Sequence, residues 1–185
     1  MADRRRPAPL RVLDVACGAG DVLVRLVRRA AHTGLRLAAT GIDRSPVAIS
    51  LASEHARATN TEVRFVVADA LQGDWPGDYD AVVSSLFLHH LSDTDAMTLL
   101  RRMGNSAGRL VLVNDLRRSQ MGYLLAWVGT RLLSRSSVVH YDGPISVTSA
   151  WTTDEALHLA TASGLTGARC DRRWPFRFLL SWEKP

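Results

Sequence analysis

Short apolar runs alternate with segments of helical periodicity along the first 115 residues. The apolar runs predict buried strands at residues 10–16, 35–42, 63–68, 79–85 and 109–113. Apolar residues at helical spacing predict helices at 21–32, from Ser45-Pro46 onward, and at 92–103. Strands that alternate with helices or turn-rich connections indicate a parallel sheet with helices on both faces and right-handed crossovers.

The last third of the chain has a different pattern. Helices are expected at residues 116–133 and 153–163, a polar stretch at 134–149, and strands at 166–170 and 174–182. No linker, repeat or low-complexity segment divides the sequence. We therefore expect residues 1–185 to form one α/β domain, a doubly wound sheet that ends in a hairpin.

Composition narrows the class of protein. With 185 residues, 46% hydrophobic and 22% charged, the chain resembles one ordinary globular domain. No apolar run reaches the roughly 18 residues of a membrane span, and the N-terminus lacks the apolar core of a signal peptide. We expect a cytoplasmic protein without stable membrane insertion.

The net charge of +5 comes from arginines in scattered short pairs, so no nucleic-acid partner is expected. Cys17 and Cys170 are too far apart for a metal knuckle or redox pair, and no metal is expected.

Acidic residues and glycines gather at the predicted ends of neighbouring strands. Asp14, Asp43 and Asp69 lie at or just after the first three strands, and Gly18 and Gly20 form the first turn. Ligands of open α/β sheets bind at the carboxyl ends of the strands. Asp43 follows Gly18 by 43 − 18 = 25 residues, which suits a carboxylate that accepts hydrogen bonds from a ribose diol.

A nicotinamide dinucleotide would use similar geometry, but two residues oppose it. Leu23 stands where the third glycine of G-x-G-x-x-G is expected. Asp21 puts negative charge at the helix N-terminus, where a pyrophosphate would bind. The turn therefore favours a ligand with a cationic end.

Five segments resemble, in order and spacing, the motifs of class I S-adenosylmethionine-dependent methyltransferases of the small-molecule type. They are residues 12–20 (VLDVACGAG), 41–46 (GIDRSP), 65–70 (FVVADA), 79–91 (YDAVVSSLFLHHL) and 109–115 (RLVLVND). The resemblance implies a doubly wound, mostly parallel seven-stranded sheet with an antiparallel last strand, and S-adenosyl-L-methionine as the cofactor. It also implies three parts: a cofactor-binding half (10–115), an acceptor lid (116–150) and a terminal helix with strand hairpin (151–185).

The resemblance assigns roles to single residues. Asp14 would face the ammonium group of the cofactor, Asp43 its ribose hydroxyls and Asp69 its adenine amino group. Taken singly, Asp43 and Asp69 are also explained as helix N-caps or turn formers. The implied cofactor-binding residues are Asp14, Ala16, Gly18, Gly20, Asp43, Arg44, Asp69, Ala70, Ser85 and Leu86.

Three histidines are candidates for a base that takes a proton from the acceptor. His89 and His90 close the fourth motif, and the resemblance places them at the rim of the cleft. His140 lies in a predicted loop beside Tyr141 and Asp142. The unperturbed histidine pKa near 6.5 suits such a base. The alternative is a structural histidine in a turn.

Residues 116–133 resemble a substrate lid. Their apolar positions follow helical spacing: Met121, Leu124, Leu125, Val128 and Leu132. An apolar lid predicts a hydrophobic or aromatic acceptor. The alternatives are a helix packed on its own core and a helix at a membrane surface, flanked by arginines.

About nine residues precede the first motif, where many similar enzymes carry helices that cover the cofactor. We expect an upstream start, a cap from a partner or second subunit, or an open site.

The main hypothesis is methyl transfer to a phenolic or polyketide-like hydroxyl, in secondary metabolism. The alternatives are a cofactor-binding subunit that is non-catalytic or partner-dependent, and an NAD-linked oxidoreductase.

Overall fold

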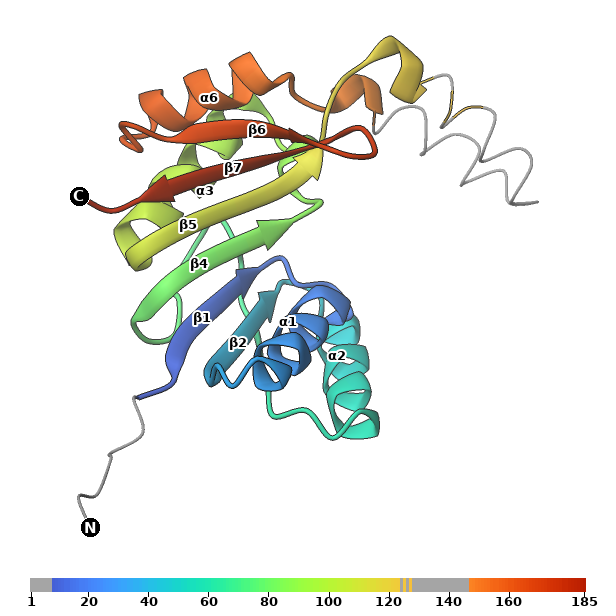
Figure 1. Cartoon of the computed structure of the whole chain (residues 1–185), viewed down its shortest axis with the longest axis vertical. Helices are drawn as coiled ribbons and strands as arrows, with labels where there is room; N and C mark the ends of the chain where they lie inside the picture. Colours follow the sequence, from blue (N-terminus) through green and yellow to red (C-terminus); the bar gives the residue numbers. More distant parts are fainter. Residues whose placement is uncertain (1–7, 124, 126, 128–146) are drawn as a thin grey trace.

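Seven strands form one sheet in the order β3-β2-β1-β4-β5-β7-β6 (Figure 1). The computed structural model of the chain describes residues 8–123, 125, 127 and 147–185. The strands are β1 (Leu10–Val15), β2 (Leu37–Asp43), β3 (Arg64–Val67), β4 (Tyr79–Ser85), β5 (Ala107–Leu116), β6 (Arg169–Arg173) and β7 (Arg177–Glu183). The first five pair in parallel, while β7 is antiparallel to both β5 and β6. The expected mostly parallel seven-stranded sheet with an antiparallel last strand is confirmed.

Helices cover the two faces of the sheet. On one face α1 (Asp21–His32) contacts β2, and α2 (Pro46–Ala58) contacts β2 and β3; on the other, α3 (Asp93–Ser106) and α6 (Thr153–Ala162) pack together (Figure 1). Alternate residues of β1 serve the two faces, because strand side chains point to opposite sides in turn. Val12 packs in one cluster with Leu23 of α1, whereas Leu13 and Val15 belong to the larger core with residues of α3 and α6.

The order of the strands reverses between β1 and β4. The chain runs outward from β1 through β2 to β3, then returns to the other side of β1 and continues to β5. Such a switch point leaves a crevice at the carboxyl ends of the two central strands. Ala16 follows β1 with φ 57° and Leu86 follows β4 with φ 57°, so both strand ends stop in a sharp left-handed turn.

Most predicted elements occur within three residues of their expected ends, and two match fully. The helix at 21–32 and the strand at 79–85 are present as predicted. The serine cap of α2 is confirmed, since the amide of Ala48 donates to Ser45 Oγ at 3.2 Å.

One boundary prediction is wrong. Residues 116–119 do not begin a helix, because β5 pairs with β7 as far as Leu116, which lies opposite Arg177. Helix begins at Gln120, and Ser119 caps it by accepting the amide of Gly122 at 3.0 Å. Beyond this, residues 124, 126 and 128–146, with His140 and most of the predicted lid, lie outside the described residues.

No described helix is long and apolar enough to cross a membrane.

Candidate active site

A pocket of about 620 Å³ lies at the carboxyl ends of β1, β2, β3 and β4. Its wall combines residues that follow each of these strands, as expected at the switch point. The lining residues are Ala16, Asp43, Arg44, Ala68, Asp69, Ala70, Leu71, Gln72, Leu86, Phe87, His90 and Leu91. Seven of the predicted site residues are therefore brought together: Ala16, Asp43, Arg44, Asp69, Ala70, Leu86 and His90.

The turn after β1 is tied to the end of β2. The amide of Cys17 donates to the carbonyl of Ile42 at 2.9 Å, and the amide of Gly18 donates to Asp43 Oδ2 at 3.0 Å. The second oxygen of Asp43 accepts the amide of Ser45 at 2.9 Å. Asp43 thus performs the turn-forming role considered as an alternative. Each carboxylate oxygen has a further lone pair, so Asp43 also keeps acceptor capacity toward the pocket.

The two predicted glycines of this turn are needed for different reasons. A Cβ on Gly20 would lie 2.8 Å from Phe65 Cζ and 3.0 Å from Ala52 Cβ, and its φ is 77°. A Cβ on Gly18, where φ is 53°, would meet nothing within 4 Å. Gly20 therefore lets α1 pack closely on its neighbours, whereas Gly18 leaves open space beside the turn.

Asp14 is a buried carboxyl group with an incomplete set of partners. It is 1% exposed, and no described residue offers a hydrogen bond to its Oδ1 atom. Burial, and then the nearby carboxylate of Asp43, raise the pKa of Asp14 to about 7. A buried carboxylate of this kind is stabilised by a cationic or hydrogen-bond-donating ligand. Asp14 does not itself line the measured pocket.

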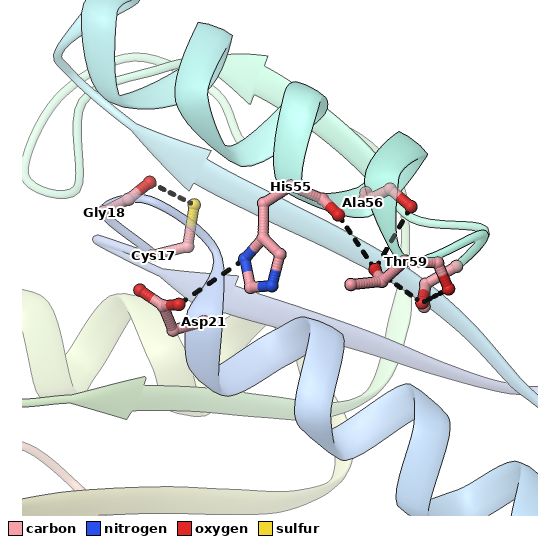
Figure 2. A network of polar contacts seen from close by, with 7 residues as sticks. Cys17, Gly18, Asp21, His55, Ala56 and Thr59 are labelled. Carbon is pink, nitrogen blue, oxygen red and sulfur yellow. Dashed lines mark hydrogen bonds and ion pairs between the residues drawn. The ribbon is translucent and has the colours of Figure 1, made fainter.

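The start of α1 carries the negative charge expected from the sequence. In Figure 2, His55 of α2 reaches toward Asp21, and its Nδ1 lies 3.5 Å from Asp21 Oδ1. Beside Asp21 in this view, the Cys17 thiol points to the carbonyl of Gly18 at 3.7 Å. Burial, followed by Asp14 and Asp43, raises the pKa of Cys17 to about 12, so its thiol stays protonated and unreactive near neutral pH.

The loop after β3 forms part of the wall of the pocket. Asp69 Oδ1 accepts the amide of Leu71 at 2.7 Å, and the carbonyl of Asp69 accepts Trp75 Nε1 at 3.2 Å. Five further lining residues were missed from the sequence: Ala68, Leu71, Gln72, Phe87 and Leu91. The sequence could have indicated them only by their position, since each lies within two residues of a predicted site residue.

The two adjacent histidines of η1 (Leu88–His90) occupy different environments. His90 is exposed and lines the pocket, whereas His89 is 6% exposed and does not line it. Nδ1 of His89 lies 2.6 Å from Oδ1 of Asp115, at the end of β5, and the two imidazole centroids are 4.0 Å apart. Asp115 was not predicted as a site residue. The signal available in the sequence was its position, because an acidic residue that directly follows an apolar strand needs a partner if the fold buries it.

Of the remaining predicted residues, Gly18, Gly20, Ser85 and His89 lie at the strand ends beside the pocket without lining it. His140 lies outside the described residues. Within the described ranges, no group of three or more His, Cys, Asp or Glu residues is placed to hold a metal ion.

A larger hollow of about 840 Å³ lies at the amino ends of β1 to β4. Arg11, Arg36 and Arg64 line it together with Glu62 and several alanines. None of the predicted site residues reaches it, because they lie at the opposite ends of the same strands. The smaller pocket is therefore the candidate active site.

Three comparisons with known proteins agree on the family. Residues 12–107 match the family model described as a methyltransferase domain. An uncharacterized methyltransferase of Mycobacterium tuberculosis is 31% identical, and the match covers 94% of this chain and 87% of that protein. The chain belongs to the class I S-adenosylmethionine-dependent methyltransferases.

Further relatives of this methyltransferase include proteins of assigned chemistry. A ubiquinone biosynthesis O-methyltransferase of Methylococcus capsulatus is 30% identical, over 84% of this chain and 66% of that protein. The solved apo structure of the S-adenosylmethionine-dependent methyltransferase SibL is 25% identical with a TM-score of 0.74. The match covers 96% of this chain, which spans about half (51%) of the SibL chain.

The residues of this methyltransferase fit its cofactor, S-adenosylmethionine. The buried Oδ1 of Asp14 lacks a partner, and Gly18 leaves open space beside the same turn. Asp43 and Asp69 supply carboxylates around the pocket. A ligand with an ammonium group, hydroxyls and an amino group matches these acceptors, whereas Asp21 would repel a pyrophosphate. The alternative nicotinamide cofactor is therefore set aside.

Proposed function

We propose that this methyltransferase transfers the methyl group of S-adenosylmethionine to a hydroxyl group of a hydrophobic small molecule, such as a phenol or polyketide. The observation that carries the proposal is the arrangement of the pocket. Carboxylates that suit the cofactor line the same pocket as His90 and the apolar residues that flank η1. A cytoplasmic location and a place in secondary metabolism belong to the same proposal.

Oxygen is the proposed acceptor atom because of the relatives. Several proteins that align with most of this chain are named ubiquinone biosynthesis O-methyltransferases, at 28–32% identity. The apolar character of the acceptor is supported by the helix that begins at Gln120. Met121, Tyr123, Leu125 and Trp127 expose between 41% and 58% of their surface there. This helix follows β5, so it starts at the same edge of the sheet as the pocket.

A nearby hollow supports the same acceptor class. Its volume is about 300 Å³, and the surface that its lining residues present to it is almost wholly apolar, although four of the six are polar. The lining residues are Arg118, Ser119, Gln120, Tyr123, Val147 and Thr148. We propose that residues 116–150 act as the acceptor lid, with this hollow at its base.

In the proposed mechanism, the bound cofactor supplies an electrophilic methyl group on sulfur. Asp14 and Asp43 bind and orient the cofactor through its ammonium and ribose groups. Asp69 and Ala70 orient the adenine. Alignment of acceptor and donor provides much of the rate acceleration in such a transfer.

His90 is the proposed proton acceptor, because its ring borders the pocket. A ring nitrogen would accept the hydroxyl proton while the acceptor oxygen gains the methyl group, whose bond to sulfur breaks to leave S-adenosylhomocysteine. His89 is proposed as a positioning residue, since its Nδ1 is bound to Asp115 and its ring lies against that of His90. In the reverse assignment, His89 oriented by Asp115 would be the base. The histidine variants described below distinguish the two assignments.

The first experiment is calorimetric titration with S-adenosylhomocysteine, followed by an acceptor screen that measures S-adenosylhomocysteine formation with hydrophobic phenols. Micromolar binding that is lost in Asp43→Ala and kept in Asp78→Ala, a fully exposed control, supports the cofactor assignment. Binding without turnover on any hydroxylated acceptor would favour the non-catalytic or partner-dependent alternative. Binding of NADH in place of S-adenosylhomocysteine would contradict the proposal.

Once an acceptor is found, histidine variants test the base. His90→Gln should lower kcat by about 10²- to 10⁴-fold with little change in cofactor affinity. His158→Ala, an exposed histidine on α6, should not change kcat. A loss in His89→Gln that exceeds the loss in His90→Gln would move the base to His89.

A further inference from the structure

One wall of the candidate active site is a loop. Residues 68–78 connect β3 to β4, and five of them line the pocket: Ala68, Asp69, Ala70, Leu71 and Gln72. A loop has no ladder of backbone hydrogen bonds, so its shape depends on the side chains that hold it.

Arg102 of α3 holds this loop from the side of the helix. Its Nη2 atom donates to the carbonyl of Gly73 at 2.6 Å and to the carbonyl of Gln72 at 3.3 Å. Its guanidinium also lies over the ring of Trp75, with Cζ 4.8 Å from the ring centroid. One half-buried side chain therefore contacts three residues of the loop. The two N–H groups of Nη2 can serve both carbonyls, while the planar guanidinium stacks on the indole ring.

Trp75 connects this contact to the pocket. Its Nε1 donates to the carbonyl of Asp69, while the Asp69 side chain accepts the amide of Leu71. Leu71 and Trp75 also pack against the main hydrophobic core. The chain of contacts runs from α3 through Arg102 and Trp75 to the backbone of Asp69, a residue that lines the pocket.

We propose that Arg102 is a positioning residue for cofactor binding. It holds residues 69–73 in the conformation that receives the adenine end of the cofactor, and this inference rests on the proposed function. Arg102 does not line the pocket, so it acts only through the loop. Without it the loop must be ordered when the cofactor binds, and that cost appears as weaker affinity.

The test compares Arg102→Ala and Arg102→Lys with Arg101→Ala. Arg101 is the adjacent, exposed arginine of the same helix, so it is a matched control. Calorimetry with S-adenosylhomocysteine, well below the unfolding temperature, should show about three- to tenfold weaker binding for Arg102→Ala. Arg102→Lys keeps the charge and N–H donors but loses the planar group that stacks on Trp75, so its affinity should lie between those of Arg102→Ala and the wild type. Arg101→Ala should bind as the wild type does.

Hydrogen exchange gives a second readout that does not depend on turnover. The amides of residues 69–75 should exchange faster in Arg102→Ala than in the wild type, and the difference should shrink when S-adenosylhomocysteine is bound. Arg101→Ala should show no such change.

The outcomes separate this inference from the proposed function. Wild-type affinity in Arg102→Ala, with binding lost in Asp43→Ala, would overturn the role of Arg102 and leave the proposed function intact. An equal loss in Arg101→Ala would also overturn it, because the effect would then be general destabilisation. Absence of binding by the wild type would overturn both.

Discussion

Nδ1 of His89 lies 2.6 Å from Oδ1 of Asp115, and this contact joins the turn after β4 to the end of β5. Both side chains are almost fully buried. Asp115 also accepts the backbone amide of His89 at 3.3 Å through Oδ2 and that of Leu116 at 2.6 Å. One carboxyl group thus fixes the neighbouring strand ends that carry the proposed acceptor side of the site.

Asp115→Asn should destabilise the protein by about 1–3 kcal/mol, because an amide cannot accept at both oxygen positions and leaves buried donors unpaired. Urea unfolding followed by circular dichroism measures the change. Asp171→Asn is the control, since Asp171 is exposed and its pair with Arg173 is 3.6 Å long. If Asp115→Asn were as stable as Asp171→Asn, the buried contact between His89 and Asp115 would contribute nothing to the free energy of unfolding.

Gly20→Ala should cost more stability than Gly34→Ala, although the two glycines have nearly the same φ, 77° and 76°. The backbone strain of about 1 kcal/mol is common to both. Only at Gly20 would the new Cβ collide with Phe65 and Ala52. We expect a total loss of about 2–4 kcal/mol at Gly20, measured by urea unfolding. Similar losses at both positions would contradict the close packing of α1.

Asp14 should make the free energy of unfolding fall as pH rises. Its pKa is raised from 3.8 to about 7 in the folded chain, so the folded state binds this proton more tightly than the unfolded state does. Protonated Asp14 therefore contributes its full share to the free energy of unfolding below pH about 4, and this contribution is lost as pH rises through about 7. Asp14→Asn should flatten this slope in urea unfolding at a series of pH values. An unchanged slope in the variant would assign the dependence to other groups.

Cofactor binding should release a proton from Asp14 near or below pH 7. An ammonium group beside the carboxylate favours its ionised form, so the pKa falls when the cofactor binds. Titration of S-adenosylhomocysteine in buffers of different ionisation enthalpy measures the released protons. Release should decrease above pH about 8 and should be absent in Asp14→Asn. Equal proton release by the wild type and the variant would exclude Asp14 as the source.

Much of the fold was predictable because its signals are local. The helix at 21–32 and the strand at 79–85 were predicted at the residues where they occur, since their apolar spacing depends only on neighbouring positions. The parallel order of the strands also placed Asp43 and Asp69 at one edge. The start of the helix after β5 was predicted wrongly, because that boundary is set by pairing with β7, some 60 residues further along the chain.

The site shows the same division between local and distant causes. The order of strands, glycines and acidic residues in the sequence by itself indicated the class of fold and the edge of the sheet where the candidate site lies. The resemblance to methyltransferase motifs added single residues, and seven of the residues that it implied line the pocket. Only the tertiary structure decided that His90 borders the pocket while His89 is bound to Asp115, and that Arg102 of α3 holds the loop beside Asp69. The bonded partners are separated by 26 to 30 residues, and no periodicity links them. Their contacts exist only because folding brings the turn after β4, the end of β5 and the face of α3 against one another.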